Sequence, residues 1–275
     1  MQKQTRTLCF DRDLALEAYR LAGIVQPFPN HFHDFYVLGY LVSGQRALSC
    51  KGQESTLRPG DMILFNPGDN HACAQCGSAP LHYLGFNIPK DVMQKWAQEI
   101  TGSAALPCFA PTVVRDEEAA RCFVPLHRAV MADSREFEKE ELMLFLLSLL
   151  LQKYSAPFVE PPVDGRAEVE RACRLMEQHF AEPLSLSALC GCAGLSKSAL
   201  LRAFTRHKGM TPYRYLQTVR IGQAKKLLEQ GTPAMEAALR TGFYDQSHFT
   251  KFFMQFIGLS PRAYRDIFEN KNLER

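Results

Sequence analysis

The stretch Gly242–Arg265, GFYDQSHFTKFFMQFIGLSPRAYR, decides how the second half of this chain is interpreted, because the chain contains it twice. An earlier copy, Leu195–Tyr215, reads LSKSALLRAFTRHKGMTPYRY. Serine, phenylalanine, glycine, proline and tyrosine recur at a constant offset, in the pairs Ser198 and Ser247, Phe204 and Phe253, Gly209 and Gly258, Pro212 and Pro261, and Tyr215 and Tyr264. The helix-capping residues Ser196 and Asp245 also coincide. Two copies of a helix-turn-helix unit are therefore predicted.

The second helix of each copy is predicted to have one buried face and one outward face. The apolar faces comprise Leu200, Ala203 and Phe204 in the first copy and Phe249, Phe252 and Phe253 in the second. The outward faces are expected to contact DNA and comprise Ser198, Leu201, Arg202, Thr205, Gln246, Ser247, Thr250 and Lys251. Arginine and lysine bond guanine, glutamine bonds adenine, and a leucine contacts the thymine methyl group.

The segment between the two copies explains their spacing. It is predicted to form one helix from Pro212 to about Gln230, with proline in the first turn, where its missing N–H costs nothing. At about 1.5 Å per residue this helix is roughly 27 Å long. The major groove faces the same side of DNA every ~34 Å. One chain can therefore present both helices to consecutive major-groove segments.

The charge distribution and the cysteine content both agree with a cytoplasmic protein that binds DNA. Residues 166–275 carry 17 Lys and Arg against 10 Asp and Glu, whereas residues 1–165 carry 15 against 19. A basic second half favours a polyanionic partner. The first residues lack the apolar core of a secretion signal. Nine cysteines at irregular spacing are typical of a reduced, cytoplasmic protein.

The remaining sequence divides the chain into domains. Short β-type runs separated by turn residues predict a barrel over about 20–95, followed by helices over about 116–154. The apolar run Leu142–Leu151 is about half a membrane span, so we expect a buried helix and no membrane contact. The proline-rich segment 155–165 is the expected linker. The predicted fold class is α+β, with domains at 1–154 and 166–275 and helix-turn-helix motifs at about 185–208 and 233–257.

The repeated pattern, preceded by Arg220–Leu228 (RIGQAKKLL), resembles the signature of the AraC/XylS family of bacterial transcription regulators over about residues 167–270. The resemblance implies a regulator of transcription, not an enzyme, that binds double-stranded promoter DNA and contacts RNA polymerase. It places the base-reading positions at Ser198, Leu201 and Arg202 and at Gln246, Ser247 and Lys251.

The first half resembles the cupin barrel with which many such regulators hold an effector. In HFHDFYVLGYLVSGQ, His31 and His33 alternate onto one face of a strand. The turn PGDNH is expected to bring His71 to the same end of the barrel. These three histidines are the expected contacts to a small-molecule effector. Metal-dependent cupins have a glutamate four or five residues after the second histidine, where this chain has Val37 and Leu38. No metal and no other cofactor is therefore expected.

Two alternatives remain open from the sequence. The run HACAQC places Cys73 and Cys76 beside His71, which is compatible with a thiol- or metal-responsive regulator, and a cupin enzyme is the other alternative. Tyr36 and Tyr40 lie on the strand face opposite the histidines, so only one of these two sets faces the pocket. The helices over 116–154 form either a homodimer contact or a cover for the barrel.

Overall fold

The chain folds into two compact units, Met1–Pro161 and Pro162–Arg275. The computed structural model describes residues 4–134, 136–155 and 165–273, and in 269–273 only the backbone. The first unit is built on antiparallel strands and the second on helices alone, which confirms the predicted α+β class. Most of the expected linker 155–165 lies outside the described residues. No described helix has the length and apolarity needed to span a bilayer.

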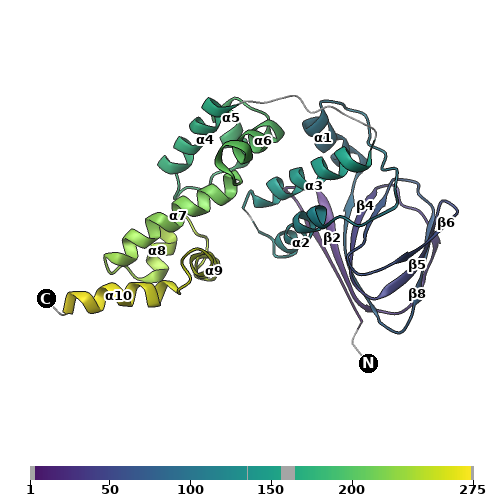
Figure 1. The fold of residues 1–275 in the computed structure, drawn as a ribbon, viewed down its shortest axis with the longest axis horizontal. Coiled ribbons are helices and arrows are strands. Elements are labelled where there is room, and N and C mark those ends of the chain that lie inside the picture. Colours follow the sequence, from purple (N-terminus) through teal and green to yellow (C-terminus); the bar gives the residue numbers. More distant parts are fainter. Residues whose placement is uncertain (1–3, 135, 156–164, 274–275) are drawn as a thin grey trace. The chain divides into compact units, whose positions relative to one another are not determined.

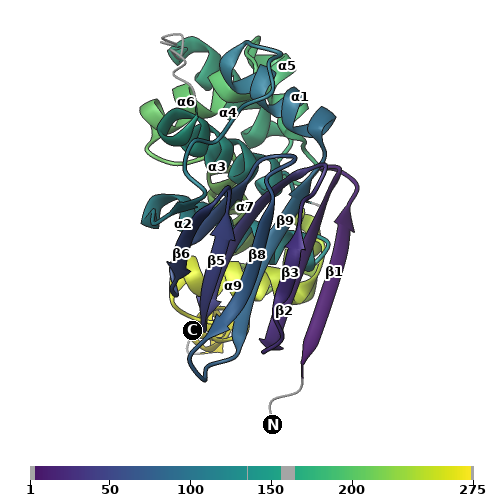
Figure 2. The same ribbon diagram turned by 90° about the vertical axis from the view of Figure 1, so that its right-hand side faces the viewer.

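Two antiparallel sheets face each other in the first unit (Figures 1 and 2). The larger has the strand order β1-β2-β9-β4-β7-β10 and the smaller β3-β8-β5-β6. The strands are β1 (Thr5–Asp11), β2 (Leu16–Ile24), β3 (Phe28–His31), β4 (Tyr36–Ser43), β5 (Gln45–Cys50), β6 (Gln53–Leu57), β7 (Met62–Phe65), β8 (His71–Cys76), β9 (Leu81–Ile88) and β10 (Val113–Val114). Alternate residues of both sheets, including Val37, Leu48 and Phe65, form an apolar core.

The barrel begins earlier than the predicted residue 20, because β1 pairs along its whole length with residues 16–22 of β2. The prediction missed β1 for a physical reason. This strand lies at the edge of the larger sheet, and most of its side chains are exposed, including Leu8 and Phe10. The alternation of buried and exposed residues that marks a half-buried strand is therefore absent from its sequence.

Three helices accompany the sheets: α1 (Lys90–Thr101), α2 (Glu117–Met131) and α3 (Glu138–Tyr154). Helix α2 packs against α3 and against β1, β2 and β9 of the larger sheet (Figure 1). On α2, Phe123 packs against Phe86 with ring centroids 4.9 Å apart, and Nε2 of His127 lies 2.9 Å from the backbone oxygen of Tyr19. Helix α3, which contains the apolar run 142–151, is buried along most of its length.

Asp116 caps the N-terminus of α2 and joins it to the end of α3. Its carboxylate accepts hydrogen bonds from the backbone N–H groups of Glu118 and Ala119 and from the side chains of Lys153 and Tyr154, all between 2.9 and 3.0 Å. Burial opposes ionisation, but these hydrogen bonds outweigh it and lower the pKa of Asp116 to about 2.

Asp116→Ala is expected to lower the free energy of unfolding of the first unit by about 1–2 kcal/mol at pH 7, as loss of an N-cap does. The native carboxyl has a lower pKa than in the unfolded chain, where it is about 3.9. Its contribution is therefore present above pH 4 and is lost as the pH falls toward 2. Urea unfolding followed by fluorescence of the single tryptophan, Trp96 on α1, measures this. Asp116→Asn, which keeps a capping oxygen, should lose less.

The second unit consists of helices α4 (Arg166–Gln178), α5 (Leu186–Ala193), α6 (Lys197–Lys208), α7 (Pro212–Glu229), α8 (Ala234–Arg240), α9 (Gln246–Ile257) and α10 (Pro261–Leu273). The long helix α7 packs against α4 and α6 on one side of the repeat and against α8, α9 and α10 on the other. It therefore belongs to the cores of both helix-turn-helix units, which lie along its length in Figure 1.

The predicted capping residues begin the helices as expected. Ser196 accepts a hydrogen bond from the N–H of Ala199 at the start of α6, and Asp245 accepts one from the N–H of His248 at the start of α9. Gly209 and Gly258 end the same two helices in left-handed conformations. Since both helices begin and end on matching residues, the sequence repeat is a structural repeat.

Candidate functional site

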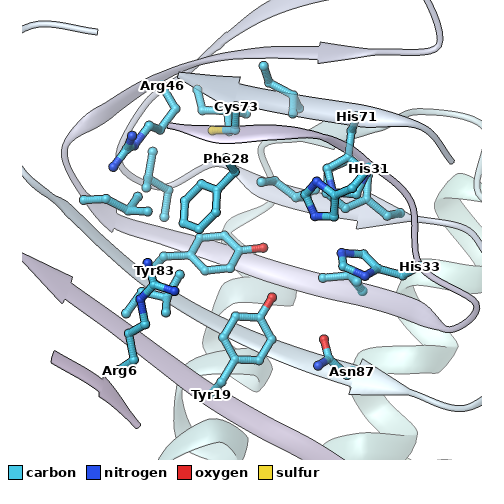
Figure 3. Close-up of a pocket in the computed structure, with 18 of the residues that line it drawn as sticks. Arg6, Tyr19, Phe28, His31, His33, Arg46, His71, Cys73, Tyr83 and Asn87 are labelled. Carbon is cyan, nitrogen blue, oxygen red and sulfur yellow. The ribbon is translucent and has the colours of Figure 1, made fainter. Parts of the chain in front are cut away.

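A cavity of about 370 Å³ lies between the two sheets of the first unit. Its walls are mainly apolar side chains from β2, β4, β5, β7 and β9, with polar groups gathered at its ends. Figure 3 shows the histidines at one end, the arginines at the other, and Phe28, Tyr19 and Tyr83 between them. An apolar cavity with a few convergent polar groups is the usual form of a small-molecule site.

The three predicted histidines meet at one end of this cavity. His31 on β3 is directly opposite His71 on β8, and His33 follows shortly after. The ring centroids are 4.4 Å apart for His31 and His71, 4.8 Å for His31 and His33, and 5.2 Å for His33 and His71. Burial, helped by the other two rings, lowers the pKa of His33 to about 4, and burial also lowers that of His71. Both rings are therefore neutral at pH 7.

The tyrosines that competed with the histidines for the pocket face the other side of the larger sheet. The hydroxyl of Tyr36 donates to the backbone oxygen of Pro107 at 2.6 Å, and the ring of Tyr40 lies 6.1 Å from that of Phe123 on α2. The cavity lining includes all three histidines and neither tyrosine.

Two other tyrosines, which the sequence analysis did not single out, enter the cavity over glycines. Gly39 on β4 pairs directly with Gly85 on β9. The hydroxyl of Tyr83 occupies the place where a Cβ of residue 39 would lie, and the ring of Tyr19 occupies the same place at Gly85. Burial raises the pKa of Tyr19 to about 12 and that of Tyr83 well above its usual value, so both hydroxyls remain protonated donors. A glycine inside a strand signals this kind of close approach.

The opposite end of the cavity contains two arginines. The guanidinium carbons of Arg6 and Arg46 each lie 5.9 Å from the centre of the Phe28 ring. Arg46 is only 1% exposed and donates to the backbone oxygens of Ile24 at 2.6 Å and Gln26 at 3.1 Å. Among the described residues no carboxylate forms an ion pair with it. Burial lowers the pKa of Arg46, the sign of a cation that lacks full compensation.

The cysteine pair proposed as a thiol or zinc site is not assembled by the strand that contains it. Cys73 and Cys76 are three residues apart on β8, and residues at odd spacing point to opposite faces of a strand. Cys73 lines the cavity, and burial raises its pKa to about 11, which disfavours the reactive thiolate. In the described parts of the chain, the histidine cluster is the group placed to hold a metal ion.

Helix α9 of the second unit presents the predicted outward face. Phe249, Phe252 and Phe253 are buried, as expected. Gln246, Ser247 and Lys251 are exposed and Thr250 is half-buried, and together with Met254 they line a surface hollow of about 440 Å³. A helix anchored by three phenylalanines thus holds a row of polar side chains toward solvent.

Helix α6 differs from the prediction at two positions. Leu200, Ala203 and Phe204 are buried as expected, Thr205 is exposed and Arg202 is half-buried. Ser198 and Leu201, however, are only 4% and 2% exposed, so the expectation that they face outward is wrong. The Arg202 side chain folds back and donates a hydrogen bond to the Ser198 hydroxyl. Because α6 packs against α4, α5 and α7, more of its surface than a single stripe is covered.

Comparisons with known proteins agree with both halves of this description. Residues 14–150 match the model of the AraC-like ligand binding domain, and residues 189–267 match that of a helix-turn-helix domain. The chain is 47% identical over 90% of its length to the uncharacterized HTH-type transcriptional regulator YbfI of Bacillus subtilis, covering 90% of that protein. It is 27% identical to the arabinose operon regulatory protein of Salmonella typhimurium, covering 91% of this chain and 94% of that one.

Among solved structures, the chain resembles a transcriptional regulator with an AraC-type DNA-binding domain from Chromobacterium violaceum. The identity is 28% and the TM-score 0.35, over 37% of this chain and 91% of that one. Both relatives are named as regulatory proteins. From the two domain matches and the extent of the likeness, this chain belongs to the AraC family of DNA-binding transcriptional regulators with an N-terminal ligand-binding domain.

Proposed function

We propose that this cytoplasmic regulator binds a small-molecule effector in the cavity of its first unit and that the bound effector controls how its second unit engages promoter DNA. The observation that supports the proposal most directly is the cavity itself, which lies between the two sheets with neutral histidines at one end and arginines at the other. Tyr19 and Tyr83 add hydroxyl donors between them.

The arginine end indicates the chemistry of the effector. A buried cation is costly unless an anion compensates it, and the partners of Arg46 among the described residues are two backbone carbonyls and the ring of Phe28. An effector with a carboxylate or phosphate placed beside Arg46 and Arg6 would supply that compensation through charge-assisted hydrogen bonds. Phe28, between the two guanidinium groups, offers an apolar surface to the rest of the molecule.

DNA contact is assigned to the exposed faces of α6 and α9. In α9 the contacts are Gln246, Ser247, Thr250 and Lys251, which lie in one row of the surface hollow. In α6 they are Arg202 and Thr205, whereas the buried Ser198 and Leu201 are assigned no contact. The pairing of a basic reader with a polar one in each helix fits base-edge contacts in the major groove.

Two buried contacts join the cavity wall to the outer helices and offer a route for coupling. His127 of α2 bonds the backbone oxygen of Tyr19, whose side chain lines the cavity. Lys139 of α3 is 3% exposed and donates to Asp11 at 2.6 Å and Asp13 at 3.0 Å, at the turn between β1 and β2. A shift of β2 on effector binding would therefore reach α2 and α3, where a homodimer contact is proposed.

Gly39→Ala tests the effector site. The new methyl group would overlap the Tyr83 hydroxyl, so the ring must swing into the cavity and occupy the effector's place. In a thermal screen of small carboxylates and phosphates read by Trp96 fluorescence, the wild type should be stabilised by about 2.7 kcal/mol at a hundredfold excess over Kd. Gly39→Ala should lose this response.

The matched control is Val42→Ala on the same strand, whose side chain is 40% exposed and does not line the cavity. It should respond to the effector as the wild type does. An effector that stabilises both variants equally would show that binding takes place outside the cavity.

A further inference from the structure

The histidine end of the cavity has a geometry that effector binding alone does not require. One ring nitrogen from each of His31, His33 and His71 lies within 4.8 Å of the other two, although the three side chains come from two different strands and a loop. Figure 3 shows the three rings turned toward a common point at the edge of the cavity. Three imidazole nitrogens gathered this closely form a set of ligands that suits one metal ion.

Backbone contacts fix which nitrogen the rings of His31 and His71 offer to that point. Nδ1 of His31 lies 2.6 Å from the carbonyl oxygen of Pro29, and Nδ1 of His71 lies 2.9 Å from that of Asp69. A carbonyl oxygen only accepts, so the N–H that faces it is on Nδ1, and in a neutral ring the lone pair is then on Nε2. Histidine ligands of metal ions are oriented by the same kind of hydrogen bond from the other ring nitrogen.

Aromatic neighbours hold two of the three rings in place. The ring of His71 stacks on Phe65 with centroids 3.8 Å apart, and that of His33 stacks on Phe35 at 4.8 Å. Val37, where metal-dependent cupins have their glutamate, lines the cavity as an apolar side chain. The histidines therefore form a three-nitrogen set that lacks the carboxylate. Three neutral imidazoles suit zinc, nickel, copper and iron, and three protein ligands leave a coordination position open.

We propose that His31, His33 and His71 bind one divalent transition-metal ion through ring nitrogens, with an open coordination position facing the cavity. Metal–nitrogen distances are about 2.0–2.1 Å, so the nitrogens, which lie within 4.8 Å of one another, would move closer together around the ion. The bound ion would leave a positive charge at this end of the cavity, and an oxygen donor of the effector would complete its coordination. Only this last step rests on the proposed effector function.

Cobalt(II) titration of the full chain, first freed of metal with EDTA, tests the site. We expect one Co²⁺ per chain, with a d–d absorption spectrum and without the thiolate-to-cobalt band that cysteine ligands produce. His33→Ala and His71→Ala should each weaken binding at least about 100-fold, since loss of a ligand costs no less than loss of its supporting contact. His82→Ala is the control, because His82 lies on β9 outside the cluster and contacts Arg20.

Trp96 fluorescence melting shows whether each variant is folded, and His33, which is half-buried, is the variant that disturbs the core least. Retention of Co²⁺ by both cluster variants, a thiolate band, or no binding by the wild type would each overturn the proposal. The effector screen with Gly39→Ala is run in EDTA as well as with Zn²⁺. If the chain binds no metal but still responds to the effector, only the metal proposal fails. If it binds metal but responds to no effector, only the effector proposal fails.

Discussion

Arg220→Met is expected to destabilise the second unit by about 3–5 kcal/mol. The variant should lose promoter binding at temperatures close to the melting temperature of its second unit. Arg220 lies in the middle of α7 and is 2% exposed. Its guanidinium donates from Nε to the backbone oxygen of Phe180 at 2.8 Å and from Nη2 to that of Glu182 at 3.1 Å. Hydrogen bonds from a charged donor contribute about 1.5–3 kcal/mol each. Methionine fills similar space but replaces neither.

The effect should reach both DNA-binding helices because of where Arg220 lies. It joins α7 to the segment after α4, and its guanidinium is 6.0 Å from the ring of Phe243, which packs on Phe249 of α9. Since α7 belongs to the cores of both repeats, loosening its centre releases α6 and α9 from their fixed spacing. The helical signal in circular dichroism should therefore show an earlier transition, together with loss of DNA binding.

Two observations separate this result from general damage. Trp96 belongs to the first unit, so the fluorescence transition should not move in Arg220→Met. Arg240→Met, which removes an exposed arginine paired with Glu236 at 3.5 Å, should change stability by less than about 0.5 kcal/mol. Equal melting of the Arg220 and Arg240 variants would contradict the role given to Arg220.

The double variant Gln246→Ala with Lys251→Ala should weaken specific promoter binding at least about 30-fold while leaving the fold intact. Both side chains are exposed on α9, and the helix is held by phenylalanines that the change does not touch. Each base-edge contact is worth about 1–3 kcal/mol, and every 1.4 kcal/mol is a factor of about ten in affinity. Fluorescence anisotropy with promoter DNA and with unrelated DNA measures the loss.

The single variants divide the contacts by kind. If Lys251 bonds a base, Lys251→Ala reduces the base preference at one position of the operator. If it contacts a phosphate, binding weakens on all sequences, and the slope of log affinity against log salt concentration falls by about 1 in magnitude. Gln255→Ala is the control, since Gln255 is exposed on the same helix outside the surface hollow. Unchanged affinity in the double variant would remove α9 from the DNA interface.

Local chemistry in the sequence was enough to locate the helical repeat. Ser196 and Asp245 cap their helices with their own side chains, and the spacing of Phe249, Phe252 and Phe253 sets the buried face of α9. Such features act within a few residues, so they can be read from the order of residues alone. The likeness to the AraC family rests on the same local pattern. Ser198 and Leu201 were misplaced because the coverage of α6 depends on neighbours from elsewhere in the chain.

The cavity depended on contacts that no local pattern records. The sequence predicted that His31, His33 and His71 contact the effector. Only the pairing of β3 with β8 places His31 opposite His71. Tyr19 and Tyr83 enter the cavity because Gly39 and Gly85 lie side by side on β4 and β9, a register fixed by the whole sheet.

The sequence by itself therefore determined the family, the two helix-turn-helix units and the histidines, because capping, helical periodicity and short motifs are properties of neighbouring residues. Only the tertiary structure decided what shares the cavity with those histidines, the buried Arg46 at its far end and the two tyrosines over glycines, and it decided the separation of Cys73 from Cys76. Side chains from strands far apart in the chain meet only after the sheets pair and close on each other, and burial and charge compensation are set at that stage.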